Sequence, residues 1–134
     1  GITRGLKLSM FDISDPGNVT ELHRFVIKGV TWCPALENYK SILAQPEKNL
    51  IGFFCDNRYL VFRYDESEGF RRELLYDFYE DMLNNIAGYD TTRGLYINDD
   101  FYIAGNEFLL SFAINDGFRK TGCLELTIPE VSAP

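Results

Sequence analysis

An apolar run followed by a short acidic turn and a second apolar run occurs three times in this chain. The copies are centred on Phe11, Phe62 and Phe112, which stand 51 and 50 residues apart. The turns read "SDPG", "DESEG" and "NDG". Asp and Asn side chains bond to nearby backbone groups in turns, and Gly accepts a positive φ. Each copy is therefore predicted to be a strand–turn–strand unit.

A further pair of apolar runs precedes the second and the third unit. These pairs are "SILAQPEKNLIGFF", with a turn at 45–49, and "GLYINDDFYIAG", with a turn at 98–100. The first unit has no such pair before it. The predicted order is half a repeat and then two complete repeats of four strands each. A period of about 50 residues with four strands per repeat is typical of propeller blades.

The central runs support stacked blades. "LIGFF", "YLVF" and "FLLSFAI" are apolar at both odd and even positions, whereas a strand with one wet face alternates apolar with polar residues. Both faces of these strands are therefore expected to be covered, as in a blade between two neighbours. A β-sandwich or a solenoid-like stack built from the same strands is the alternative.

The sequence thus predicts an all-β fold, a partial β-propeller with about two and a half four-stranded antiparallel blades and about ten strands. The chain is expected to be a single β domain over residues 1–134 and a fragment of a larger propeller. We predict a partial blade at 1–30 and complete blades at 40–78 and 93–128. Phe11, Phe62 and Phe112 should occupy equivalent positions near the end of the third strand of each blade.

Residues 70–89 also fit a helix, with Gly88 as a C-cap and one apolar side formed by Leu74, Leu75, Phe78, Met82 and Ile86. The repeat favours an outer strand for 70–78. For residues 79–87 we expect a short helix or an irregular insertion between blades.

Three strings carry a family resemblance: "GLKLSMFDISDPGNVTELHRFVI", "YKSILAQPEKNLIGF" and "TRGLYINDDFYIAGNEF". Together they resemble the C-terminal part of the bacterial secreted β-propeller domain family, which is distantly related to WD-40 repeats. The likeness covers nearly the whole chain and departs at 79–91. It implies an extracytoplasmic or cell-surface bacterial protein, often membrane-tethered through a segment absent here. It implies no established activity and no catalytic residues.

The net charge and the shortness of the apolar runs exclude nucleic acids and membranes as expected partners. Thirteen Lys and Arg against twenty Asp and Glu give a net charge of −7, and the basic residues are scattered. Nucleic acids and anionic membranes both attract a clustered positive field, so neither is an expected partner. The chain contains no run of 18 apolar residues and does not open with a signal-peptide pattern.

The three cysteines, Cys33, Cys55 and Cys123, are widely spaced and form no CxxC, and His23 is the only histidine. This spacing does not fit a zinc site. We expect all three cysteines to be buried free thiols. The alternative, in an oxidising compartment, is a Cys33–Cys123 or a Cys55–Cys123 disulfide.

Catalytic chemistry has little support. His23 lies inside a predicted strand, and neither a G-x-S-x-G elbow nor a phosphate-binding glycine loop is present. We expect no catalytic residue and no cofactor. Oxygen-rich side chains crowd the turns, but on different blades and without EF-hand spacing, so turn formation is favoured over calcium binding. These are Asp12, Asp15, Asp65, Glu66, Glu68, Asn115 and Asp116. The pair Asp56-Asn57 and residues 98–100 are likewise predicted as hairpin turns.

Trp32 and Tyr39 form the candidate partner surface, because they lie in a linker between blades and such connections emerge on propeller faces. The alternative is that Trp32 caps an inter-blade groove as core. A binding or scaffolding module for a protein, peptide or glycan is the favoured function. A fragment of an extracytoplasmic enzyme, with catalytic residues in missing blades, is the alternative.

Uncovered blade faces also predict self-association, most simply as a symmetric dimer. The residues expected near this contact are Leu8, Met10, Phe25 and Ile27.

Overall fold

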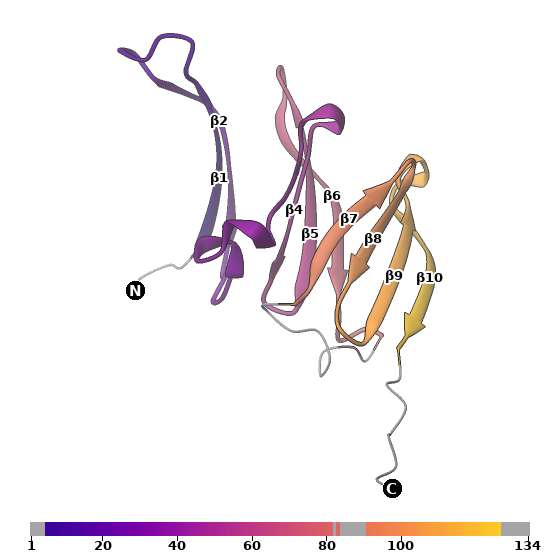
Figure 1. Ribbon diagram of the computed structural model, residues 1–134. Coiled ribbons are helices and arrows are strands. Elements are labelled where there is room, and N and C mark those ends of the chain that lie inside the picture. The colour runs from indigo at the N-terminus through magenta and orange to yellow at the C-terminus, as the bar shows by residue number, and fades with distance from the viewer. Residues whose placement is uncertain (1–4, 82, 84–90, 127–134) are drawn as a thin grey trace, which may run out of the picture.

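A computed structural model describes residues 5–81, 83 and 91–126 and contains ten strands in three separate sheets (Figure 1). The first sheet has two strands, β1 (Gly5–Asp12) and β2 (Thr20–Lys28). The second has four, β3 (Leu43–Gln45), β4 (Leu50–Cys55), β5 (Arg58–Asp65) and β6 (Gly69–Asp77). The third has four, β7 (Arg93–Ile97), β8 (Asp100–Ala104), β9 (Phe108–Ala113) and β10 (Arg119–Glu125).

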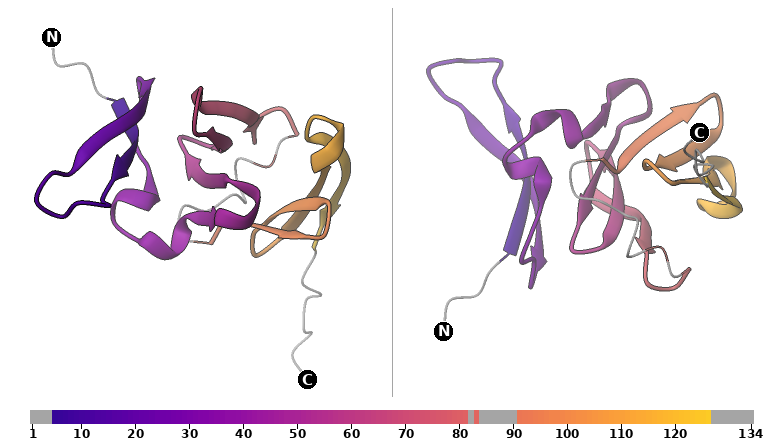
Figure 2. Two further views of the ribbon diagram at one scale, coloured as in Figure 1. Left: turned by 90° about the horizontal axis from the view of Figure 1, so that it is seen from above. Right: turned by 60° about the horizontal axis from the view of Figure 1, so that its bottom comes forward.

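Each sheet is an antiparallel meander in chain order, and the three sheets stand side by side (Figure 2). The sheets lie within the ranges 1–30, 40–78 and 93–128. The all-β, partial-propeller prediction is confirmed. The helical elements of the described residues are four 3-10 turns, Pro34–Leu36, Tyr39–Ser41, Pro46–Lys48 and Ile114–Asp116. None of these turns has the length or apolar character to cross a membrane.

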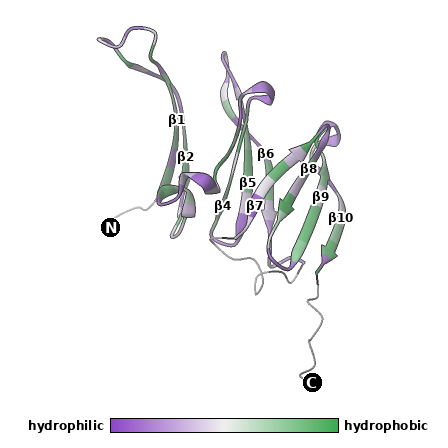
Figure 3. Ribbon diagram, viewed as in Figure 1, coloured by the Kyte–Doolittle hydropathy of each residue, from purple (hydrophilic) through white to green (hydrophobic). Residues whose placement is uncertain are grey.

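Two apolar clusters fill the spaces between the sheets. β5 contributes to both, because its successive residues point to opposite faces: Tyr59 and Val61 belong to the cluster shared with the third sheet, Leu60 and Phe62 to the cluster shared with the first. This explains why the central runs are apolar at both parities, and Figure 3 shows hydrophobic residues along β8 and β9 of the third sheet as well.

A β-bulge lies at the same place in all three strand–turn–strand units, although nothing in the sequence pattern indicates it. In each unit the ladder shifts by one residue beside the repeated phenylalanine. The extra residue always belongs to the strand after the acidic turn, and such bulges strengthen the local twist. The extra residues are Leu22, Glu73 and Thr121.

The repeated phenylalanines lie on β1, β5 and β9, as the repeat predicts. Phe62 is fully buried against the first sheet, and Phe112 is 1% exposed and buried against the second. Each therefore faces the preceding sheet. Phe11 is 50% exposed, because within the described residues no sheet precedes its own.

The predicted self-association contact is wrong in its placement. Leu8, Phe25 and Ile27 pack against the cluster that the first sheet shares with the second. Met10 is half-buried beside them. The exposed apolar residues of the first sheet are instead Phe11, Leu22 and Val26. Self-association itself stays a prediction, which sedimentation at micromolar concentration tests.

The strand prediction for 70–78 is confirmed in its essentials, because Gly69–Asp77 form β6. Residues 79–81 continue as a turn, and Leu83 is fully buried. The helix or insertion expected for 79–87 and the C-cap at Gly88 fall largely on residues 82 and 84–90, which lie outside the described residues.

Candidate partner surface

The linker at 29–42 joins the first sheet to the second and holds the two predicted partner residues. Trp32 is 43% exposed and Tyr39 is 77% exposed. Trp32 is therefore a surface side chain and not the core cap of the alternative. Leu36 lies between them in sequence and is 72% exposed. Sequence reasoning missed Leu36, because a single leucine in a linker gives no signal. We call Trp32, Leu36 and Tyr39 the linker surface.

Asp56 fixes the start of the linker to the β4–β5 hairpin. Its Oδ2 accepts a hydrogen bond from the Thr31 amide at 2.8 Å, and its Oδ1 accepts from the Trp32 amide at 2.8 Å and the Thr31 hydroxyl at 2.6 Å. The Asp56 amide in turn donates to the Trp32 carbonyl at 3.1 Å. The backbone under the Trp32 side chain is thereby held in one place.

The hairpin turn that carries Asp56 has a clear sequence cause. Asp56 and Asn57 have φ values of 49° and 59°, as a two-residue type I′ turn requires, and Asp and Asn tolerate this region best among non-glycine residues. The hairpin prediction is confirmed. Burial opposes ionisation of Asp56, but the hydrogen bonds from Thr31 and Trp32 outweigh it and lower its pKa. The anchor is therefore charged at neutral pH.

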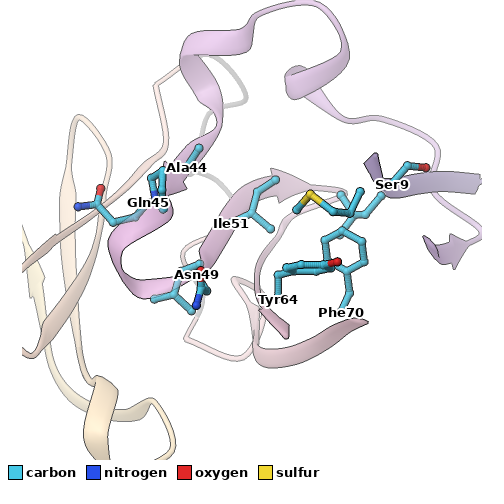
Figure 4. Close-up of a pocket in the computed structure, with 11 residues that line it drawn as sticks. Ser9, Ala44, Gln45, Asn49, Ile51, Tyr64 and Phe70 are labelled. Atoms are coloured by element: carbon cyan, nitrogen blue, oxygen red, sulfur yellow. The ribbon is translucent and has the colours of Figure 1, made fainter. Parts of the chain in front are cut away.

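A groove separates β1 from the beginning of β4 (Figure 4). It has a volume of about 300 Å³ and a mainly apolar lining that includes Met10, Ile51, Tyr64 and Phe70. The groove borders the edge of β1, which pairs only with β2 among the described strands. The equivalent strands β5 and β9 pair on both edges. The groove therefore lies where the four-stranded sheets have the strands that precede β5 and β9. The position of the groove explains its apolar lining without a ligand.

His23 contributes to the contact between the first two sheets. Its Nδ1 lies 2.8 Å from the Tyr64 hydroxyl, and its ring lies close to Gly69, where a Cβ would meet the His23 side chain at 3.0 Å. This placement gives His23 a packing role at the surface between sheets.

The carboxylates of the acidic turns accept hydrogen bonds from groups within the same turn. Asp12 Oδ1 accepts from the Ser14 amide at 2.9 Å, and Asp15 Oδ1 accepts from the Gly17 amide at 3.0 Å. Asp65 Oδ1 accepts from the Ser67 hydroxyl and amide and from the Glu68 amide, and these bonds lower its pKa. Within the described ranges, no group of three or more His, Cys, Asp or Glu is arranged to hold a metal ion. These carboxylates form turns, as Asx geometry requires.

Calcium is therefore expected to leave the stability unchanged. Thermal melts recorded with millimolar calcium and with a chelator should agree within error, because a cation that binds only the folded state must raise the melting temperature. A rise of several degrees with calcium, lost on replacing Asp65 by Asn, would show a site at these turns.

Cys33 and Cys55 are buried free thiols, whereas Cys123 is exposed on β10. The expectation of buried free thiols is thus correct for the first two and wrong for Cys123. Both bridges considered from sequence are excluded in this arrangement, because Cys33 and Cys55 lie in the cluster between the first and second sheets and Cys123 belongs to the third sheet.

One comparison with known proteins identifies the family. A family model described as the beta propeller domain matches residues 1–117. This range contains β1 to β9, that is, the first two sheets and three of the four strands of the third. Neither the curated proteins nor the solved structures contain a match. The match, the four-stranded meanders and the stacking of three sheets agree, and the chain belongs to the beta propeller domain family.

Proposed function

We propose that this chain is a non-catalytic binding or scaffolding module of an extracytoplasmic protein, which recognises a protein, peptide or glycan through the linker surface. The observation that carries this proposal is the exposure of Trp32, Leu36 and Tyr39 on one short linker whose start is bonded to Asp56. Aromatic side chains supply large contact areas, and a preordered backbone reduces the entropy lost on binding.

The remaining polar groups support binding more than catalysis. His23 packs between two sheets, and the turn carboxylates bond to their own backbone. The net charge of −7 disfavours nucleic acid as the partner. The resemblance of the three quoted strings to secreted propellers supports the proposed extracytoplasmic location.

Selection from a phage-displayed peptide library, together with a glycan array, tests the proposal. Ligands that bind the wild-type protein are then measured against Trp32→Ala and Tyr39→Ala. We expect each substitution to weaken binding by about tenfold or more, since buried aromatic anchors typically contribute more than 1 kcal/mol. Because Trp32 is the only tryptophan, its fluorescence should also shift on binding.

Ile13→Ala is the matched control. Ile13 is 71% exposed and lies in the β1–β2 turn, at the end of the first sheet opposite the linker (Figure 1). Its replacement removes a similar exposed apolar side chain and should leave binding unchanged. The proposal fails if no peptide or glycan binds, or if the selected ligands bind the Trp32 and Tyr39 variants as well as the wild type.

A further inference from the structure

Two buried thiols from separate segments meet beneath the linker. Cys33 is 4% exposed and Cys55 is 3% exposed, and both belong to the cluster between the first and second sheets. The residues between them include β3 and most of β4, so their meeting results from the path of the chain and not from local geometry.

Backbone contacts on both sides of the pair hold it in register. The Asp56 amide donates to the Trp32 carbonyl at 3.1 Å, and the Cys33 thiol donates to the Phe54 carbonyl at 3.6 Å. Cys55 lies between Phe54 and Asp56 in the chain and is thereby held opposite Cys33. The two thiols are close enough for each to shift the pKa of the other.

We propose that Cys33 and Cys55 form an intrachain disulfide when the folded protein meets a small organic disulfide, and that this bond fastens the linker to the second sheet. The reaction is two successive exchanges. One cysteine thiolate attacks a sulfur of the reagent, forms a mixed disulfide and releases one thiolate. The second cysteine loses its proton, attacks the protein sulfur of the mixed disulfide and releases the other thiol. Two protein thiols are oxidised, and one reagent disulfide is reduced to two thiols.

The surroundings of the pair favour the first step. The hydrogen bond from Cys55, with the amides of Ala35 and Leu36, lowers the pKa of Cys33 to about 7 against the opposing effect of burial, and the same contact raises the pKa of Cys55. The lowered pKa favours the thiolate form of Cys33, and the thiolate is the nucleophile in thiol–disulfide exchange.

A cavity gives a small reagent a route to the pair. It has a volume of about 230 Å³, borders Cys55 and lies between β2, the linker and the second sheet. Three cations, Lys28, Arg58 and Arg72, and one carboxylate, Asp56, are among its lining residues. The contact with Cys33, burial and the charge of Asp56 raise the pKa of Cys55, so Cys33 is the attacking thiolate of the first exchange and Cys55 supplies the second thiol.

Peptide mapping of the oxidised protein decides the question, because trypsin separates the three cysteines. Cys33 falls in the peptide 29–40, Cys55 in 49–58 and Cys123 in 121–134. The folded protein is incubated with 2-hydroxyethyl disulfide, the remaining thiols are alkylated under denaturing conditions, and the digest is analysed by mass spectrometry. We expect 29–40 linked to 49–58, and only Cys123 free to react with reagent or alkylator.

Thermal melts add a second readout. In a Cys123→Ser background, oxidation should raise the melting temperature by several degrees, because the bond closes the loop between residues 33 and 55 in the unfolded chain. Dithiothreitol should reverse the rise, and Cys55→Ser in the same background should abolish it.

The peptide map of the oxidised wild-type protein tests the proposal even if Cys55→Ser prevents folding. Alkylation of both Cys33 and Cys55 after oxidation would overturn the proposal. So would a lasting mixed disulfide on either residue, or a linkage of either residue to the Cys123 peptide.

Discussion

Replacing Gly94 by alanine is expected to lower the free energy of unfolding by about 3 kcal/mol, the upper end of the usual range for overpacked cores. A Cβ at Gly94 would lie 2.1 Å from the Tyr59 hydroxyl oxygen and 2.7 Å from the Cζ of the same ring. Tyr59 is fully buried between the second and third sheets. Its ring has no free space to enter, so the two sheets must move apart or the tyrosine must leave its rotamer.

A second glycine also lies against the Tyr59 ring. A Cβ at Gly52, in the neighbouring strand β4, would meet the Tyr59 Cε1 atom at 3.0 Å. The ring therefore spans two glycines, one from its own sheet and one from the next. The absence of side chains at Gly52 and Gly94 allows the two sheets to approach as closely as they do.

Urea unfolding of the wild type, Gly94→Ala and Gly17→Ala measures this effect. Gly17 lies in the exposed β1–β2 turn, where an added Cβ would meet only the Asp15 carboxylate at 3.4 Å. The turn variant should change stability by less than about 0.5 kcal/mol. Adding Tyr59→Phe to Gly94→Ala should recover part of the loss, because it removes the atom in closest conflict. An unfolding midpoint for Gly94→Ala equal to that of the wild type would contradict the close approach.

Alanine at the three repeated phenylalanines should have unequal effects. Phe62→Ala and Phe112→Ala should each lower the free energy of unfolding by about 3–5 kcal/mol, as truncation of buried aromatic residues does. The ring of Phe62 lies 5.0 Å from that of Phe25 in the first sheet. The ring of Phe112 lies 5.6 Å from that of Tyr76 in the second. Each substitution thus leaves a cavity between two sheets.

Phe11→Ala is the internal control, because Phe11 has the same repeat position and the same chemistry. Half of its surface is exposed, so its truncation should cost less than about 1 kcal/mol in this chain. Urea unfolding compares the three variants directly. Equal losses at all three positions would show that Phe11 is covered in solution, and a small loss at Phe62 would contradict the packing of the first sheet on the second.

The strands and turns could be predicted because local chemistry and the repeat agree. Asp, Asn and Gly mark each turn, and the Asp56-Asn57 hairpin has the positive φ values that its residues favour. The helix pattern at 70–78 was a local alternative. The strand forms because Leu74 and Phe70 contribute to the second sheet's two different apolar clusters, and tertiary packing outweighs a helical period.

The neighbours of each face could not be predicted from sequence. Alternation shows that Leu8, Phe25 and Ile27 share a face of the first sheet, but it does not show that this face meets the second sheet. The contact of Cys33 with Cys55 depends in the same way on the path of the linker. Leu36 becomes part of the candidate surface only through its exposure, which a 3-10 turn in an irregular segment decides.

Cross-strand nuclear Overhauser effects in the isotopically labelled protein test the central claim most directly. The claim is that three separate antiparallel sheets stack through their faces. We expect backbone Hα–Hα effects within β1–β2, within β3 to β6 and within β7 to β10, as antiparallel pairing gives. Between sheets we expect only side-chain effects, such as those joining the rings of Phe25 and Phe62. A backbone ladder joining β2 to β3 or β6 to β7 would contradict the account, because it would merge the blades into a continuous sheet.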